Sequence, residues 1–379
     1  MNAIINAKIV LENAVIDNGV ILYENGKIVD FNSADKITVP SCAVIFDAKN
    51  NFVGPGFVDI HCHGGGIASF PANPAGAAEF HLKNGTTTIL GALYPTLSPD
   101  QHVESLERIF EAQKNGAKSL AGVYMEGPYL NEEYGSNMHK NQWRGTAHPD
   151  DYKKVVDKAG KAVKVWAFAP ERPGVEEFMK YAKQVNPDVV FSVAHSNATP
   201  AQTEPLKKYG VLNLTHCCDA THRQPCEGGT RNCGPDETCY LDDNMYAEMI
   251  CDSEGIHVNP YMMKLIMKIK SKDKVILISD STISDPSMPM GRETEDLNFD
   301  ENDGLAGSKL TLRLAVRNLI KHTGVSISDA FKMASRNPAR LIGMANEIGT
   351  IAVGKKANFV ILKDNFEIEN VILEGELVC

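Results

Sequence analysis

Short runs of apolar residues alternate with longer amphipathic stretches through the middle of the chain, from about residue 55 to residue 344. The apolar runs have the length of buried strands, and the stretches between them repeat apolar residues at helical spacing. Helical stretches include residues 99–115, 175–184, 261–270 and 310–322. Eight strands alternating with helices predict a (β/α)8 barrel. The expected strands are residues 58–63, 87–93, 120–125, 163–169, 189–195, 211–216, 247–251 and 275–280.

A doubly wound open sheet is the alternative architecture for this alternation. Such a sheet often carries Gly-x-Gly-x-x-Gly after its first strand, where the glycines let the backbone approach a dinucleotide. No such motif follows residues 58–63. The pattern therefore favours the closed barrel.

Both ends of the chain show a different pattern, with short apolar runs separated by Gly, Asn and Asp. This is typical of strands joined by hairpin turns. We expect a small β-sandwich domain formed by residues 1–53 and 346–379, with residues 54–345 forming the barrel. Its predicted strands are residues 3–11, 14–23, 27–31, 44–47, 348–353, 359–363 and 371–378.

Composition and charge limit the binding partners and the cellular location that we expect. The 379 residues carry a net charge of −10, which argues against nucleic acid or an anionic membrane surface as partner. No stretch approaches the ~20 apolar residues of a membrane span. The N-terminus lacks the pattern of a signal peptide, so we expect a cytoplasmic protein whose nine cysteines are reduced.

Polar residues that can bind metal collect where the predicted strands end, which is the catalytic face of a barrel. In the first strand, side chains two residues apart face the same side, so both histidines of His61-x-His63 can share one ion. A buried histidine or a helix-capping acid would explain any one of these residues alone. Four histidines and two carboxylates at the ends of five strands favour a metal site, and such ligands suit Zn, Mn, Fe or Co. The candidates are His61, His63, Glu126, His195, His216 and Asp280.

Longer motifs surround these residues, and through them the chain resembles the metal-dependent amidohydrolase superfamily. Within it, the resemblance is to the family of N-acetylglucosamine-6-phosphate deacetylases, over nearly the whole chain. The motifs are Pro55-Gly-Phe-Val-Asp-Ile-His-Cys-His-Gly64, Gly85-Thr-Thr-Thr88, Glu126-Gly-Pro-Tyr-Leu-Asn131, Ala194-His-Ser-Asn-Ala198, Thr215-His216, Gly255-Ile-His-Val258, Ile278-Ser-Asp280, Leu305-Ala-Gly-Ser308, Asn337-Pro-Ala-Arg340 and Gly354-Lys-Lys-Ala-Asn358.

The resemblance implies roles for individual residues. Glu126, His195 and His216 would hold one divalent metal, and His61 and His63 would add a second with Glu126 bridging. One or two ions per chain are expected, with Zn favoured over Fe, Mn or Co. Asp280 would be the catalytic carboxylate, and the family suggests a homodimer. The residues expected to bind an amino sugar are His139, Asp219, Ala220, Arg223, His257, Gly304, Leu305 and Ala306.

The chain departs from the family near the expected phosphate site. Glu132 and Glu133 replace two lysines, and Asp219 replaces an asparagine. Added negative charge disfavours a phosphate, although Arg223, Arg231 and His257 could offset it. An unphosphorylated or different N-acyl amino sugar is therefore an alternative substrate. A barrel that binds metal without catalysis is a third hypothesis, which the retained Asp280 disfavours.

Five cysteines lie within 23 positions, at residues 217, 218, 226, 233 and 239. Their spacing lacks the Cys-x-x-Cys pairs of common structural zinc sites. Reduced thiols are the simplest interpretation. A second structural metal or a disulfide stays open.

Overall fold

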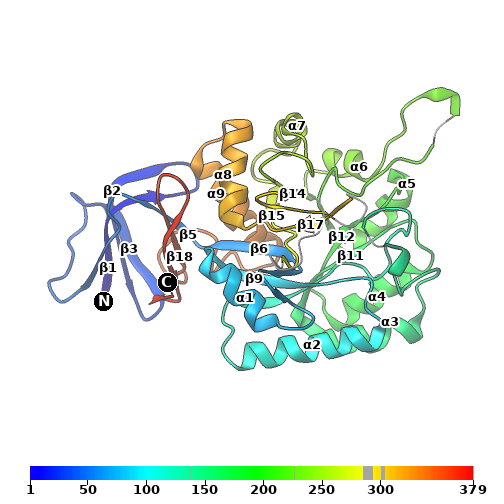
Figure 1. Cartoon of the computed structure of the whole chain (residues 1–379), viewed down its shortest axis with the longest axis horizontal. Helices are drawn as coiled ribbons and strands as arrows, with labels where there is room; N and C mark the ends of the chain where they lie inside the picture. Colours follow the sequence, from blue (N-terminus) through cyan, green and yellow to red (C-terminus); the bar gives the residue numbers. More distant parts are fainter. Residues whose placement is uncertain (137, 226, 285–292, 300–303, 379) are drawn as a thin grey trace.

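The computed structural model describes residues 1–136, 138–225, 227–284, 293–299 and 304–378. A barrel of strands and helices forms the larger part, and a β domain that contains both chain ends lies against one side of it (Figure 1). No helix in these described ranges has the length and apolar character needed to cross a membrane.

The barrel contains eight parallel strands that neighbour one another in chain order. At their carboxyl ends the first and last strands are joined by backbone hydrogen bonds. The Asp280 amide donates to the His61 carbonyl at 3.0 Å, and the His63 amide donates to the Ser281 carbonyl at 2.8 Å. The barrel prediction is confirmed. The strands are β6 (Phe57–Cys62), β9 (Thr86–Leu93), β10 (Leu120–Met125), β11 (Val163–Phe168), β12 (Val190–Val193), β13 (Val211–Leu214), β14 (Tyr246–Ile250) and β15 (Val275–Ile278).

Helices surround the strands, and most carry proline in their first turn, where a missing N–H costs no hydrogen bond. In α2, Ser98 and Gln101 form a reciprocal capping box. The four predicted helices all occur, within a few residues of the expected bounds. The helices are α1 (Pro74–Lys83), α2 (Pro99–Lys114), α3 (Pro149–Ala159), α4 (Val175–Val185), α5 (Pro200–Thr203), α6 (Pro235–Leu241), α7 (Pro260–Lys270), α8 (Leu312–Thr323), α9 (Ile327–Phe331) and α10 (Asn337–Leu341).

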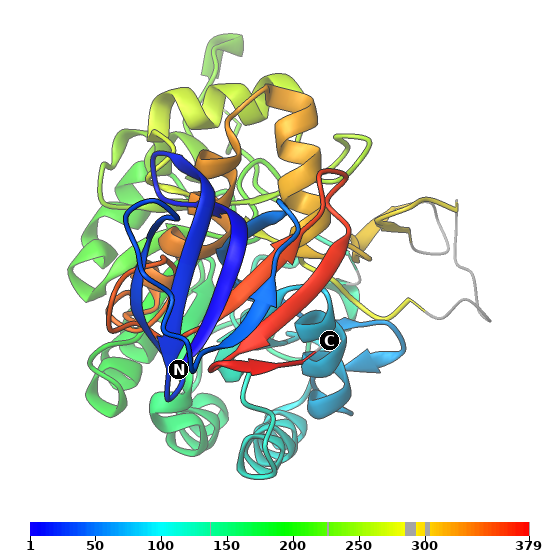
Figure 2. The same ribbon diagram turned by 90° about the vertical axis from the view of Figure 1, so that its left-hand side faces the viewer.

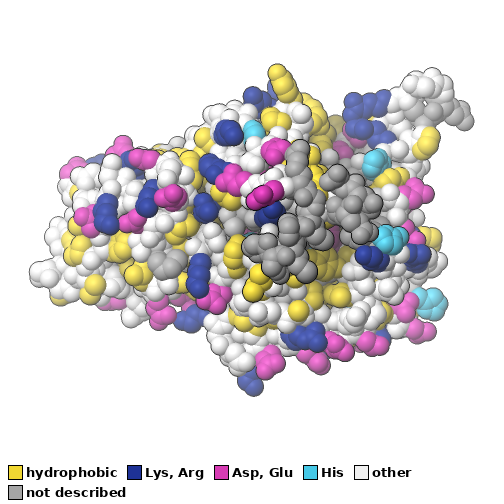
Figure 3. Space-filling view, viewed as in Figure 1, with side chains coloured by type: hydrophobic (Ala, Val, Ile, Leu, Met, Phe, Trp, Pro, Cys, Tyr) yellow, Lys and Arg dark blue, Asp and Glu magenta, His cyan; other side chains and the backbone are white. Residues whose placement is uncertain are grey.

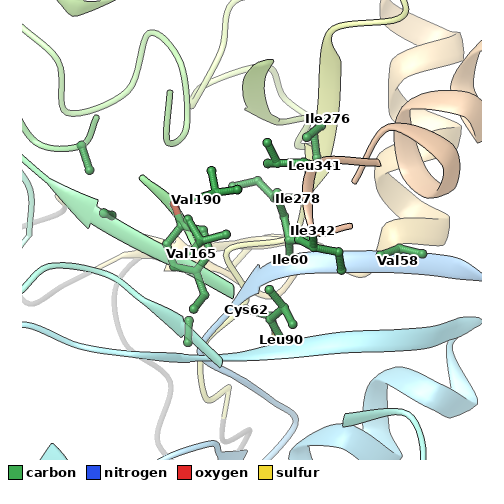
Figure 4. Packing of buried hydrophobic residues seen from close by; sticks show 14 of the residues in the cluster. Val58, Ile60, Cys62, Leu90, Val165, Val190, Ile276, Ile278, Leu341 and Ile342 are labelled. Atoms are coloured by element: carbon green, nitrogen blue, oxygen red, sulfur yellow. The ribbon is translucent and has the colours of Figure 1, made fainter. Parts of the chain in front are cut away.

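Side chains on β6 alternate between the hydrophobic core and the histidine cluster. Val58 and Ile60 belong to a buried cluster with Ile276, Ile278 and residues at the end of α10 (Figure 4). Because successive side chains on a strand face opposite sides, His61 and His63 are turned away from that cluster. Burial of the apolar face thus fixes the direction of both histidines.

The β domain is one continuous hydrogen-bonded sheet built from both ends of the chain, which Figure 2 shows as blue and red strands side by side. β5 pairs antiparallel with β18 and joins the two ends. The origin of this domain in both termini is confirmed, while the boundaries at residues 53/54 and 345/346 stay a prediction. The strands are β1 (Asn2–Val10), β2 (Val15–Glu24), β3 (Lys27–Ser33), β4 (Val44–Asp47), β5 (Phe52–Pro55), β18 (Phe359–Leu362), β19 (Ile368–Leu373) and β20 (Glu376–Leu377).

Two predicted strands of the C-terminal part differ from the structure. Residues 348–353 form no strand, because Gly349 has a φ of +88° and packs tightly against the backbone of Ser335 and Arg336. Buried Ile348 and Ile351 produced the apolar pattern. Residues 371–378 form parts of two strands, because the chain turns at Glu374 and Gly375, both with positive φ.

Candidate metal centre and active site

A cavity of about 820 Å³ opens at the carboxyl end of the barrel strands. Its lining includes five of the six predicted metal-site residues, namely His63, Glu126, His195, His216 and Asp280. The sixth, His61, is fully buried directly beneath them and lies within 3.7 Å of both carboxylates. The structure therefore brings the complete predicted set together.

Backbone geometry aims three of these side chains at the barrel axis. His195, His216 and Asp280 follow β12, β13 and β15, with φ values of +39°, +27° and +48°. Non-glycine residues rarely adopt positive φ, and each such residue costs about 1–3 kcal/mol. The surrounding structure must hold these residues in place. The hydrogen bond from the Asp280 backbone N–H to the His61 carbonyl is one such contact.

Glu126 lies at the centre of the cluster. Its Oε1 is 2.9 Å from His195 Nε2 and 3.2 Å from His216 Nε2, while its Oε2 is 3.1 Å from His63 Nε2. Asp280 Oδ1 is 3.4 Å from His63 Nε2 and 3.7 Å from His61 Nε2. Two overlapping groups of possible ligands therefore share Glu126: one with His61 and His63, the other with His195 and His216.

The outer nitrogen of two histidines identifies the tautomer of each ring. His195 Nδ1 lies 3.1 Å from the Tyr134 carbonyl, and His216 Nδ1 lies 3.0 Å from the Asp219 carbonyl. A carbonyl only accepts, so Nδ1 carries the proton, and the Nε2 lone pair of a neutral ring faces Glu126. A lone pair and a carboxylate repel unless a proton or a metal cation lies between them. The donor set therefore fits a divalent metal.

The pKa values of the cluster also favour a bound metal ion. Burial alone would raise the pKa of Glu126, but hydrogen bonds from His195, His216 and His63 lower it well below its usual value. Burial would lower the pKa of His216, yet Glu126 and Asp219 raise it to about 10. The site strongly attracts positive charge, which a bound metal ion would supply in place of protons.

Glu248 of β14 contacts the histidine cluster and was not among the residues predicted from the sequence. Fully buried, it accepts from His61 Nδ1 at 3.2 Å and from Asn213 Nδ2 at 2.5 Å. Asn213 in turn donates to Ser192 Oγ at 3.0 Å. A carboxylate behind a ligating histidine fixes its ring and raises its basicity. A lone glutamate inside the apolar run Tyr246-Ala-Glu-Met-Ile250 was the available signal.

Most predicted substrate residues line the cavity, but two do not. Asp219, Ala220, His257, Gly304, Leu305 and Ala306 are all part of its lining. His139, in the short turn η1 (Met138–Lys140), is exposed and lies outside the lining. Arg223 is also exposed and lies outside the lining, and its guanidinium pairs with Glu237 of α6.

Neither glutamate that replaces a family lysine lines the cavity. Glu132 pairs with Arg172 at 3.1 Å and lies 3.7 Å from Arg144. Arg231 also pairs with Glu237, with 2.9 Å between its guanidinium nitrogen and Glu237 Oε1. Figure 3 shows basic and acidic side chains interspersed over the face of the molecule that it presents. Among the described residues that line the cavity, Lys140 is the only lysine or arginine, and no sequence motif marked it.

Comparison with known proteins agrees with this geometry. The model of the amidohydrolase family matches residues 52–378. The chain belongs to the amidohydrolase family. Amidohydrolases are metal-dependent, and the His and Glu cluster offers possible ligands for a metal ion.

Individual relatives are similar over almost the whole length. An N-acetylglucosamine-6-phosphate deacetylase of Bacillus subtilis is 28% identical, covering 97% of this chain and 95% of that protein. An N-acetylgalactosamine-6-phosphate deacetylase of Escherichia coli O157:H7 is also 28% identical, covering 85% of this chain and 86% of that protein. The solved N-acetylglucosamine-6-phosphate deacetylase of Thermotoga maritima is 28% identical, with a TM-score of 0.80 over 100% of this chain and 99% of that chain.

Proposed function

We propose that this amidohydrolase removes the N-acetyl group of an amino sugar, releasing acetate. N-acetylglucosamine-6-phosphate, giving glucosamine-6-phosphate, is the leading substrate, as the names of the relatives indicate. The observation that carries the proposal is the position of Asp280. Its carboxylate lies at the edge of the histidine cluster and lines a cavity large enough for a sugar.

The cluster would hold one or two divalent ions. Glu126, His195 and His216 form the first group of ligands, and His61 and His63 form a second group that shares Glu126. All are nitrogen or oxygen donors, which suit Zn, Fe, Mn or Co, and Zn is favoured. When bound, the metal lowers the pKa of a water molecule and polarises the acetyl oxygen.

Asp280 is the group that moves the proton. Burial would raise its pKa, but a hydrogen bond from His63 and the positive charges of His61 and His63 lower it. An ionised carboxylate can take the proton of the attacking water. The same carboxyl then delivers the proton to the leaving amine, which must be protonated to depart.

His257 and residues 304–306, which also line the cavity, would bind the sugar. The His257 Nδ1 atom lies 3.3 Å from Asp252 Oδ2. Burial would raise the pKa of Asp252, but hydrogen bonds from His257 and from the backbone lower it to about 2. Asp252 thereby outweighs the effect of burial and raises the pKa of His257. His257 can thus present an N–H to a sugar oxygen or phosphate, beside the backbone at Gly304–Ala306.

The mixed charge of the cavity is compatible with both a phosphorylated and an unphosphorylated sugar. Lys140 supplies a cation, but Asp219 adds an anion, and Arg223 and Arg231 are both bound to Glu237. An unphosphorylated or different N-acyl amino sugar is therefore the second candidate. The acidic substitutions at Glu132 and Glu133 do not support this candidate, because those side chains lie outside the lining.

A panel of substrates tests the proposal. Acetate release is measured for N-acetylglucosamine and N-acetylgalactosamine, each with and without a 6-phosphate. If Lys140 holds a phosphate, Lys140→Met lowers kcat/KM for the phosphorylated sugars by about 10–100-fold, the loss of one charge-assisted bond. The matched control, Arg223→Met, leaves kcat/KM unchanged. No acetate from any sugar would contradict the proposed function.

Oligomeric state and compartment stay predictions. A homodimer is expected from the family resemblance, and a cytoplasmic location from the sequence pattern. Sedimentation of the purified protein would check the first.

A further inference from the structure

The cysteine-rich segment after β13 brings two sulfurs and a carboxylate together, outside the catalytic cluster. Cys217 Sγ and Cys218 Sγ lie 3.9 Å apart, and Cys217 Sγ lies 3.4 Å from Asp236 Oδ1. Cys217 is fully buried and Asp236 is 8% exposed. These three side chains form one of the possible metal-binding groups among the described residues.

We propose that Cys217, Cys218 and Asp236 bind a further metal ion outside the catalytic cluster, a tetrahedral divalent cation of the zinc class. With Zn–S bonds near 2.3 Å and Zn–O bonds near 2.0 Å, tetrahedral ligands have S···S edges of about 3.8 Å and S···O edges of about 3.5 Å. The observed 3.9 and 3.4 Å match those edges. Binding releases the two thiol protons to solvent.

A disulfide does not fit the same atoms as they stand. Bonded sulfurs lie about 2.05 Å apart, so Cys217 and Cys218 are free thiols in this structure. The left-handed backbone of Cys218, with φ of +67°, turns its side chain back toward that of Cys217. Two adjacent cysteines, whose side chains would otherwise diverge, thus face the same carboxylate.

Neighbouring groups hold the carboxylate in position. Asp236 Oδ1 accepts from the Cys218 amide at 2.9 Å, and Oδ2 accepts from Thr221 Oγ1 at 2.7 Å. The Tyr240 hydroxyl lies 3.0 Å from Cys218 Sγ and 3.5 Å from Cys217 Sγ, so it contacts both sulfurs. Such outer hydrogen bonds orient metal ligands.

An ion here would connect the end of β13 to the start of α6. Between them, the described residues 219–225 and 227–234 extend away from the barrel (Figure 1), and η4 (Glu227–Gly229) lies in this part. Cys217 and Cys218 also follow His216 directly, and the Asp219 carbonyl holds the His216 ring. The ion would therefore stabilise the segment that positions a catalytic ligand.

Cobalt(II) distinguishes this site from the catalytic one. Thiolate ligands give cobalt an intense charge-transfer band in the near ultraviolet, whereas nitrogen and oxygen ligands do not. Metal-free, reduced full-length protein is titrated with cobalt(II) to saturation, and the final amplitude of the band is expected to correspond to one thiolate-bound cobalt per chain, in addition to the cobalt held by the catalytic cluster. Absence of the band at saturating cobalt would overturn the proposal without any variant.

Variants locate the sulfur ligands. Cys217→Ser/Cys218→Ser should abolish the band and lower total bound cobalt by one equivalent, and Asp236→Asn should weaken binding at least tenfold. The matched control is Cys233→Ser, an exposed cysteine of the same segment, which should keep the full band. A band that survives the double substitution would place the sulfur ligand elsewhere, for example at Cys62, and overturn the proposal.

Discussion

At the scale of single residues, the catalytic cluster combines strained backbone with buried charge. His195, His216 and Asp280 hold positive φ values that a local sequence pattern would not favour. Their identity was predictable, because histidine and aspartate at strand ends are visible in the sequence. Glu248 and Lys140 were not predicted, because their importance depends on which strands and loops meet in space.

Asp280→Asn tests the proton-transfer role directly. The amide cannot accept the proton of the attacking water, so kcat should fall by about 10²–10⁴. Metal content should stay close to that of the wild type, because Glu126 and four histidines remain. Turnover is measured as acetate release, with metal analysis on the same sample. Near-normal kcat would assign proton transfer to another group.

Glu248→Gln tests the positioning of His61. The amide keeps the size of the side chain but no longer presents a charged acceptor to His61 Nδ1. Affinity for the ion bound by His61 and His63 should fall about 10–100-fold. Competition with a chelator measures affinity, and affinity at the His195/His216 group serves as the internal control. Equal weakening of both groups would indicate general disruption of the barrel.

At the scale of elements, the eight barrel strands were predictable because each is a short apolar run beside a helical stretch. All eight occur within two residues of their expected starts. Residues 348–353, by contrast, were predicted as a strand and form none in the structure. Buried Ile348 and Ile351 satisfy the apolar pattern, yet Gly349 bends the chain against residues 335 and 336, and that packing partner is distant in sequence.

Ile278→Ala tests how much the strand cluster of Figure 4 stabilises the barrel. Ile278 of β15 is fully buried and packs in the same cluster as Ile60. Truncation leaves a cavity and should lower the free energy of unfolding by about 2–5 kcal/mol. Denaturant unfolding measures the change. Ile67→Ala, at a side chain that is 77% exposed, should change it by less than about 0.5 kcal/mol.

At the scale of the whole molecule, stability should depend on acid through histidines buried away from the catalytic cluster. Burial lowers the pKa of His102 to about 4, against hydrogen bonds that act in the opposite direction. His102 packs edge-on against Trp143. Its folded-state pKa lies below the ordinary value of 6.5, so the unfolded chain takes up the proton first as the pH falls.

The contribution of neutral, buried His102 to the free energy of unfolding is therefore complete above pH 6.5. It is lost as the pH falls toward 4. The loss should approach about 3 kcal/mol, since each pKa unit corresponds to about 1.4 kcal/mol. Denaturant unfolding from pH 7 to pH 4.5 measures it, with His102→Gln as the comparison. A variant whose stability falls as steeply as the wild type would assign the acid sensitivity to other groups.

The central claim is that the cluster around Glu126 performs metal-dependent deacetylation of an amino sugar. The most direct test titrates metal-free protein with Zn²⁺ and follows acetate release from N-acetylglucosamine-6-phosphate together with bound metal. Activity should be absent without metal and appear as the catalytic ligands fill, and His195→Asn/His216→Asn should abolish both catalysis and binding at that group. Full activity in metal-free protein, or no acetate release at saturating metal from any N-acetylhexosamine, would contradict the account.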